Sequence, residues 1–136
     1  MANTITGAPW SVTSTAAAGA ASASKAAGAA GVAHVADRCF IGLSTGATVS
    51  ASLVVNLRDG LTGAGTVLNS WTVSAGLVTA LSGVNSVNID TGNGSLMGQY
   101  GLTGTAATGM CLEFAAAGPA NSNTVCTLYG HDVIIV

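Results

Sequence analysis

Apolar and polar residues alternate with a period of two along much of the chain after residue 32. The clearest case is "TVSASLVVNLRDG", residues 48–60, where only Val54 breaks the alternation. A period of two predicts a half-buried strand with one face toward a core. The positions expected to share the buried face are Val49, Ala51, Leu53, Val55 and Leu57.

A glycine-rich turn follows this strand, and a second apolar pattern begins directly after it. The turn is "LTGAG", residues 61–65, and "TVLNSWTVS", residues 66–74, then places Val67, Trp71 and Val73 in phase, with Asn69 as the interruption. Two alternating segments around a glycine-rich loop predict a β-hairpin.

Short alternating segments recur to the end of the sequence, and almost no helical periodicity is present after residue 32. About seven short strands separated by Gly, Asn and Asp turns predict an all-β fold, an antiparallel β-sandwich or jelly roll. In "MCLEFA", Met110, Leu112 and Phe114 should face one side and Cys111 and Glu113 the other. The expected core contains Leu53, Val55, Leu57, Trp71, Leu112 and Phe114.

The first thirty-one residues have a different composition, rich in Ala, Gly and Ser. Gly19, Gly28 and Gly31 each cost about 1 kcal/mol relative to Ala inside a helix. This pattern predicts a low-complexity arm over residues 1–31, mobile in the free protein, followed by one sandwich domain over residues 32–136. Trp10 needs a pocket, which either the domain or a neighbouring subunit could provide.

Charged residues are scarce, at 6% of the chain against 49% hydrophobic residues. Three Lys and Arg residues leave little to neutralise phosphates, which argues against nucleic-acid binding. A surface of Ser, Thr, Asn, Ala and Gly suits a subunit that packs against others. The N-terminal residues lack the features of a secretory signal, and Lys25 interrupts the Ala-rich stretch, so we expect cytoplasmic synthesis and no membrane span.

One short motif resembles a catalytic nucleophile. "GLSTG", residues 42–46, matches the GxSxG pattern around Ser44. That motif requires a helix after the serine, whereas the segment that follows here predicts a strand. We therefore expect a turn between strands.

Ionisable residues gather in two places without forming a recognisable ligand set. His34 and Asp37 should lie on opposite faces of one strand, and His131 with Asp132 lies near the C-terminus. Neither spacing matches a zinc site, and Asp90 alone is too little for a tight calcium loop. No catalytic set, metal or cofactor is predicted, and the expected role of these residues is hydrogen bonding at strand ends and turns.

The chain has three cysteines, Cys39, Cys111 and Cys126, and no CxxC pair. An odd number predicts small buried side chains in a reducing compartment. A bridge between Cys111 and Cys126 is the alternative, because these two residues could face each other on neighbouring strands.

Arg58 and Asp59 stand side by side at the mouth of the predicted hairpin. They could keep that end of the hairpin soluble, with Asp59 accepting backbone N–H bonds from the loop. At a subunit contact the same pair would contribute specificity more than affinity.

Several segments taken in order resemble a group of small tailed-phage virion proteins. They are the Ala-rich N-terminal part, "GVAHV", "NLRDGLTGAGT", "LEF" and "LYGHDV", and the similarity extends from about Pro9 onward. The resemblance implies a β-sandwich protein that decorates or cements the capsid surface of the virion by binding the major capsid protein. It also implies a homo-oligomer, with a trimer as one possibility, and it brings no catalytic residues.

Two alternatives stay open: a tail, fibre or baseplate module, and a carbohydrate-binding sandwich. For the latter, Tyr100 in "QYGL" is the best candidate for an exposed aromatic residue. The residues predicted to contact a partner are Trp10, Lys25, Arg58, Asp59 and Tyr100.

Overall fold

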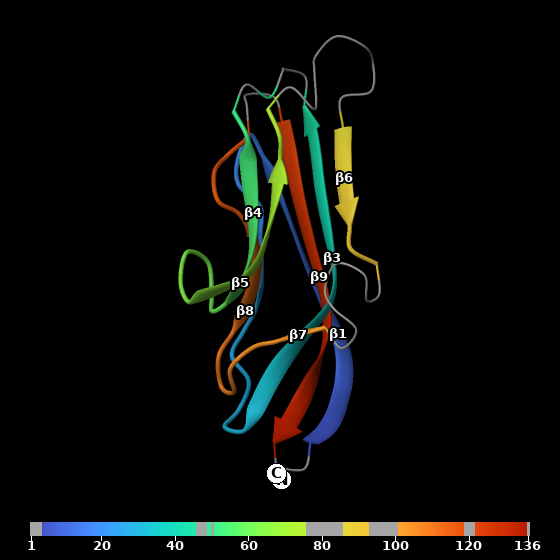
Figure 1. Cartoon of the computed structure of the whole chain (residues 1–136), viewed down its shortest axis with the longest axis vertical. Coiled ribbons are helices and arrows are strands. Elements are labelled where there is room, and N and C mark those ends of the chain that lie inside the picture. Colours follow the sequence, from blue (N-terminus) through green and yellow to red (C-terminus); the bar gives the residue numbers. More distant parts are fainter. Residues whose placement is uncertain are drawn as a thin grey trace.

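The described part of the chain consists of strands and turns. The computed structural model describes residues 4–45, 49, 51–75, 86–92, 101–118 and 122–135. These residues form two antiparallel sheets that pack face to face along the long axis of the molecule (Figure 1). Among them no helix is long and apolar enough to cross a membrane.

The two sheets contain nine strands in total. Sheet A has the order β1 (Thr4–Ala17), β9 (Ser122–Ile135), β3 (Val32–Thr45) and β6 (Ser86–Asp90), with β7 (Leu102–Thr103) also paired to β3. Sheet B has the order β2 (Ser22–Lys25), β8 (Met110–Phe114), β4 (Leu53–Asp59) and β5 (Thr66–Val73).

The strand pairs are nested like those of one long hairpin. β1 pairs with β9, β2 with β8, β3 with β6, and β4 with β5, and successive pairs alternate between sheets A and B. Rolling the hairpin up brings β9 beside β3 and β8 beside β4. This order is that of a double-sheet jelly roll, which confirms the predicted fold class.

The core lies between the sheets and contains the predicted residues. Leu53, Val55, Leu57, Leu112 and Phe114 are buried, and Trp71 is partly buried against them. Met110, Leu112 and Phe114 share the core face of β8, as the alternation predicted. The other sheet contributes a matching layer from alternate positions of β3 and β9: Cys39, Ile41, Leu43, Cys126 and Leu128.

The prediction of which residues face the core is wrong at one end of β5, the second strand of the hairpin. A β-bulge falls between the pairs Leu57 with Asn69 and Arg58 with Val67, so Leu68 is an extra residue in β5. A bulge exchanges the two faces of a strand beyond it. Val67 is therefore 42% exposed, and Leu68 packs against the core in its place.

The N-terminal segment is part of the sandwich, so the predicted arm over residues 1–31 and the domain boundary at residue 32 are wrong. β1 pairs with β9 from Thr4 to Ala17, and β2 pairs with β8 in sheet B. Ala21 and Ala23 are buried in the core. Small side chains such as these fill the core at β2 because this strand lies close to the opposite sheet. The backbone hydrogen bonds of the two ladders offset the entropy cost of ordering the N-terminal segment.

We predict that removing residues 2–17 abolishes cooperative unfolding. The deletion exposes one edge of β9 along its length and removes Trp10, Val12 and Ala16 from the wall of the core. Thermal unfolding followed by circular dichroism measures the effect, with Thr15→Ala on the outer face of β1 as the control. A truncated protein that melts cooperatively at the full-length temperature would contradict this role of β1.

Candidate functional site

A buried polar cluster joins the N-terminal strand to the C-terminal strand. The indole Nε1 of Trp10 donates a hydrogen bond to Asp132 Oδ1 at 2.7 Å. His34 Nδ1 lies 2.7 Å from the same oxygen. Trp10, which sequence reasoning left to be anchored on either the domain or a neighbour, is therefore anchored within its own domain.

The remaining contacts of this cluster fix its geometry. His34 is 1% exposed, and its Nε2 lies 2.8 Å from the carbonyl oxygen of Ala26. Both ring nitrogens thus face acceptors, and both contacts are hydrogen bonds only when each nitrogen carries a proton. The Trp10 ring meets His34 edge-on at 5.6 Å, and Lys25 Nζ lies 5.4 Å from the Trp10 ring centroid.

The contacts of this cluster favour the ionised form of the Asp132 carboxyl group. Burial opposes its ionisation, but the hydrogen bonds from His34 and Trp10 outweigh burial, so the pKa of Asp132 is lowered. The sequence drew attention to His34 and Asp132 as metal candidates. The structure brings them together as a structural pair, because they are register partners on β3 and β9.

Arg58 and Asp59 do not pair with each other, although they are adjacent in sequence. Arg58 Nε donates to Glu113 Oε1 at 2.5 Å on the outer face of sheet B, and the Gly63 N–H donates to Glu113 Oε2 at 3.0 Å. The hairpin loop therefore folds back onto β8, and Arg58 with Glu113 secures it. This arrangement corrects the expectation that Asp59 would accept the N–H bonds of the loop.

Asp59 holds a different segment in place. Its Oδ1 accepts a hydrogen bond from the Thr105 N–H at 2.9 Å, and Oδ2 accepts one from the Thr105 hydroxyl. A side chain at the adjacent Gly104 would crowd this contact, because a Cβ there would lie 2.7 Å from Asp59 Oδ1. The two charges at the mouth of the hairpin thus tie two segments distant in sequence to the sandwich.

The other charged side chains are also paired. Arg38 forms a two-point ion pair with Asp90, which lowers the pKa of Asp90 to about 2 because the guanidinium hydrogen-bonds its carboxylate. His131 Nδ1 lies 2.7 Å from Asp37 Oδ2. All three Lys and Arg and all five Asp and Glu residues lie in the described ranges, and each has an intramolecular partner.

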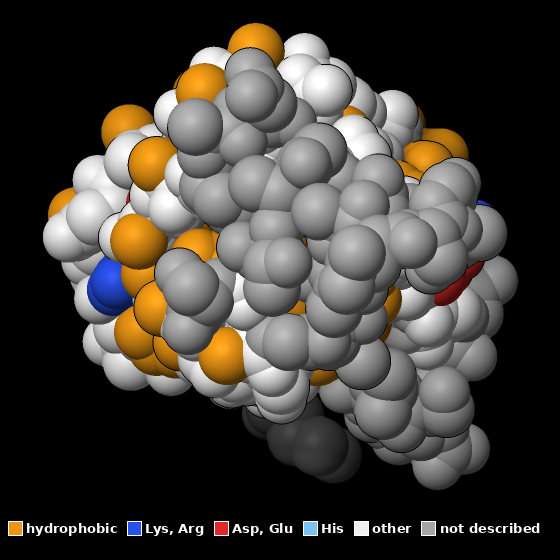
Figure 2. Space-filling model, turned by 90° about the horizontal axis from the view of Figure 1, so that it is seen from above, with side chains coloured by type: hydrophobic (Ala, Val, Ile, Leu, Met, Phe, Trp, Pro, Cys, Tyr) orange, Lys and Arg blue, Asp and Glu red, His pale blue; other side chains and the backbone are white. Residues whose placement is uncertain are grey.

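The surface is correspondingly poor in charged groups. On the end of the molecule seen in Figure 2, charged atoms occupy only small areas at the margins, and the other described atoms are hydrophobic or uncharged. Uncharged and hydrophobic groups are therefore what a partner would meet on the described part of this end.

The three cysteines are buried and none of them forms a disulfide, so the alternative of a bridge between Cys111 and Cys126 is wrong. Burial raises the pKa of Cys39 and of Cys126 to about 12, so neither is a ready nucleophile. In the described ranges no group of three His, Cys, Asp or Glu residues is placed to hold a metal ion.

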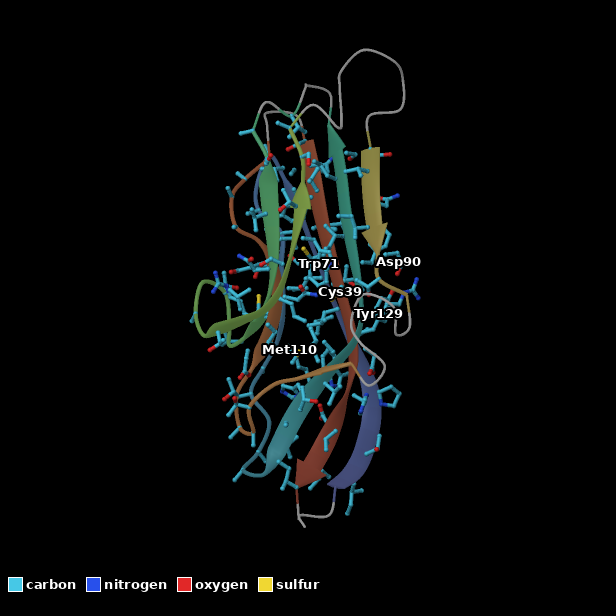
Figure 3. The ribbon with its side chains drawn as sticks, in the orientation of Figure 1. Cys39, Trp71, Asp90, Met110 and Tyr129 are labelled. Carbon is cyan, nitrogen blue, oxygen red and sulfur yellow. The ribbon has the colours of Figure 1, made fainter. Side chains whose placement is uncertain are left out.

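The outer face of sheet A carries a groove that sequence reasoning missed. Figure 3 shows Asp90 and Tyr129 on the side of sheet A that faces away from sheet B, while Trp71 and Met110 lie between the sheets. Above that pair a groove of about 210 Å³ opens over Gly42. Its lining residues are Phe40, Gly42, Leu43, Ser44, Ser86, Asn88, Asn123 and Val125.

A second surface feature lies at the end of the sandwich where β1 begins and β9 ends. Ile5 and Ile134 are register partners and are 55% and 38% exposed. Val32 pairs with Ile134 from the other side, and the neighbouring Ile135 is 46% exposed. We call these four residues the apolar end.

The predicted partner contacts are distributed over the molecule and do not form one patch. Trp10 and Lys25 lie in the Asp132 cluster, and Arg58 and Asp59 lie at the hairpin mouth. Tyr100 lies outside the described residues. The contact of these residues with a partner stays a prediction. Ser44 lies in β3, so the turn expected at this motif is wrong over the residues that the structure describes, and Ser44 lines the groove.

Comparisons with known proteins leave the chain without an assigned family. No protein-family model and no curated protein matches it. It is similar to a solved structure described as Desmodium yellow mottle tymovirus, with a TM-score of 0.38 and 10% identity, covering 99% of this chain and 88% of that chain. A similarity this low carries no argument, and the jelly-roll assignment depends on the strand order alone.

We predict that Asp132→Asn destabilises the protein at pH 7 by about 1 to 3 kcal/mol, because two hydrogen bonds lose their charged acceptor. The stability contributed by Asp132 is present above the unfolded-state pKa of about 4 and is lost as the pH falls through the lowered folded-state pKa. The variant should therefore lose less stability than the wild type between about pH 5 and pH 2.

Urea unfolding at several pH values measures this difference. Asp37→Asn, which removes a carboxylate that faces the partly exposed His131, is the matched control and should change stability at pH 7 by about 0.5 kcal/mol or less. Identical acid profiles for the wild type and Asp132→Asn would show that the cluster does not depend on the charge of Asp132.

Proposed function

We propose that the protein is a structural component of a phage virion, which decorates the capsid shell and cements it by binding across adjacent major capsid subunits. The observation that carries the proposal is the use of charge: every Lys, Arg, Asp and Glu has a partner inside the subunit. The exterior is left with few charges, of which the exposed Arg38–Asp90 pair is one, and it has an apolar end.

A neutral exterior favours permanent packing over long-range attraction. A protein that stays dispersed on its own usually has a mixed charged surface, and 6% charged residues cannot supply one. Binding through such a surface depends on apolar contact and on hydrogen bonds from hydroxyl and amide groups. A subunit that remains bound to a particle after assembly needs short-range contacts of this kind rather than long-range attraction.

The apolar end is the surface best suited to the shell. Ile5 and Ile134 lie side by side across β1 and β9, so their exposed areas are contiguous. Contiguous exposed apolar side chains mark protein contacts more reliably than scattered ones. The double-sheet jelly roll occurs in viral capsid domains and also in lectin domains, so the fold is compatible with this role without selecting it.

The capsid location follows from the resemblance to small tailed-phage virion proteins. From the same source come the major capsid protein as partner and a homo-oligomer such as a trimer, at a symmetric position on the shell. Oligomeric binding would also cover free strand edges, which otherwise invite aggregation.

We predict that Ile5→Ser combined with Ile134→Ser weakens binding to capsids by about tenfold or more. Burial of each isoleucine side chain at the contact contributes about 1 to 2 kcal/mol of binding free energy, which serine does not supply. Capsids purified without the protein are titrated with it, and bound protein is quantified after sedimentation.

The matched control is Val67→Ser combined with Leu61→Ser, which removes two exposed apolar side chains at the hairpin instead. This control should bind as the wild type does. If Ile5→Ser combined with Ile134→Ser binds capsids as tightly as the control and the wild type do, the apolar end is not the attachment surface. If the wild-type protein itself does not bind capsids, the decoration role is contradicted.

A further inference from the structure

We infer that the outer face of sheet A binds a neutral saccharide, with one sugar ring in the groove over Gly42. The inference goes beyond capsid decoration and does not depend on it, because the groove and the apolar end share no residue. A glycine in the interior of a central strand is the starting point, since it often marks a place that a ligand approaches closely.

Gly42 lies beneath the groove surface, where its neighbours leave no room for a side chain. A Cβ at this position would lie 3.3 Å from Phe40 Cε1, 3.3 Å from Asn88 Oδ1 and 3.6 Å from Val125 Cβ. The two distances of 3.3 Å are tighter than ordinary van der Waals contact, so Phe40 and Asn88 close in over the buried Gly42 and form the groove surface above it. Because β3 pairs with β6 and β9 at this point, backbone hydrogen bonds hold the floor of the groove.

The walls and rim of the groove have complementary chemistry. Phe40 and Val125 supply apolar surface, and the amides of Asn88 and Asn123 stand at the rim. An amide side chain both donates and accepts hydrogen bonds, which suits a sugar hydroxyl that does the same. The C–H face of a pyranose ring packs on an aromatic ring, so Phe40 can take the apolar side of the sugar.

The size and charge of the groove narrow the ligand class. A volume of about 210 Å³ is below the range of about 300 to 1,000 Å³ for pockets that enclose drug-sized ligands, which favours a single ring. No lining residue is charged, so a phosphate or carboxylate would find no ion pair in the groove. A neutral ring is the ligand that matches both properties.

The surface continues toward a second aromatic residue. Tyr129 lies on β9 two residues after Thr127, the register partner of Phe40, and so on the same face of the sheet. Its side chain is 37% exposed. Arg38 lies over its ring, with the guanidinium carbon 5.2 Å from the centroid, and also pairs with Asp90. An oligosaccharide that places one ring over Gly42 could place the next on Tyr129.

The test uses the full-length protein, biotinylated and displayed on streptavidin, on an array of neutral and sialylated oligosaccharides. Wild-type protein should bind at least one neutral glycan. Gly42→Val, which would displace Phe40 and Asn88 from the groove surface, should lower that signal at least tenfold, and Asn88→Ala should also lower it. Thr15→Val, on the same face and in the same cross-strand row but outside the groove lining, is the control and should keep the signal.

Circular dichroism and melting temperature establish that each variant is folded before it is applied. Asn88 is exposed, so its substitution keeps the test decisive even if Gly42→Val does not fold. Wild-type binding to no neutral glycan, binding to sialylated glycans only, or unchanged binding by folded Gly42→Val and Asn88→Ala would overturn the inference. Capsid binding by the Gly42→Val protein is measured separately, so failure of the groove and failure of the decoration role can be told apart.

Discussion

Hydrogen bonding of β9 on both of its edges holds the jelly roll together. The strand pairs with β1 on one side and with β3 on the other, over nearly its whole length. These ladders join the first and last strands of the chain, so the nested hairpin cannot open without breaking them. Leu128 and Cys126 in the core, Asp132 in the buried cluster and Val125 in the groove wall are all positioned by this one strand.

The few charges of the chain act locally. Arg58 and Glu113 secure the hairpin loop, Asp59 secures the segment around Thr105, and Arg38 with Asp90 joins β3 to the end of β6. Each contact links segments that are distant in sequence. Ion pairs near the surface stabilise a fold little in isolation, and here their contribution is to join particular segments to one another. The same use of charge leaves a neutral exterior.

Alternation in the sequence was sufficient to predict the sandwich, its core and the facing directions in β4 and β8. It failed where the contrast between the two faces of a strand is small. In "WSVTSTAA" and "ASASK" the core-facing residues are Trp10, Val12, Ala16, Ala21 and Ala23, and Ser and Thr fill most positions between them, so a two-residue period was present but was interpreted as low complexity. Strand register explains the other failures. The pairing of His34 with Asp132 and the groove over Gly42 need the strands of sheet A aligned to the residue, and a bulge at Asp37 shifts that alignment. A separate bulge at Leu68 shifts the hairpin in sheet B.

The central claim is that many copies of this chain coat the shell of a phage particle. Counting the copies on purified particles, by quantitative mass spectrometry against the major capsid protein, tests it most directly. The account predicts on the order of hundreds of copies per particle, since decoration follows the icosahedral symmetry of the shell. A count in the low tens or fewer, on the order expected for the symmetry of a tail or baseplate, would contradict it.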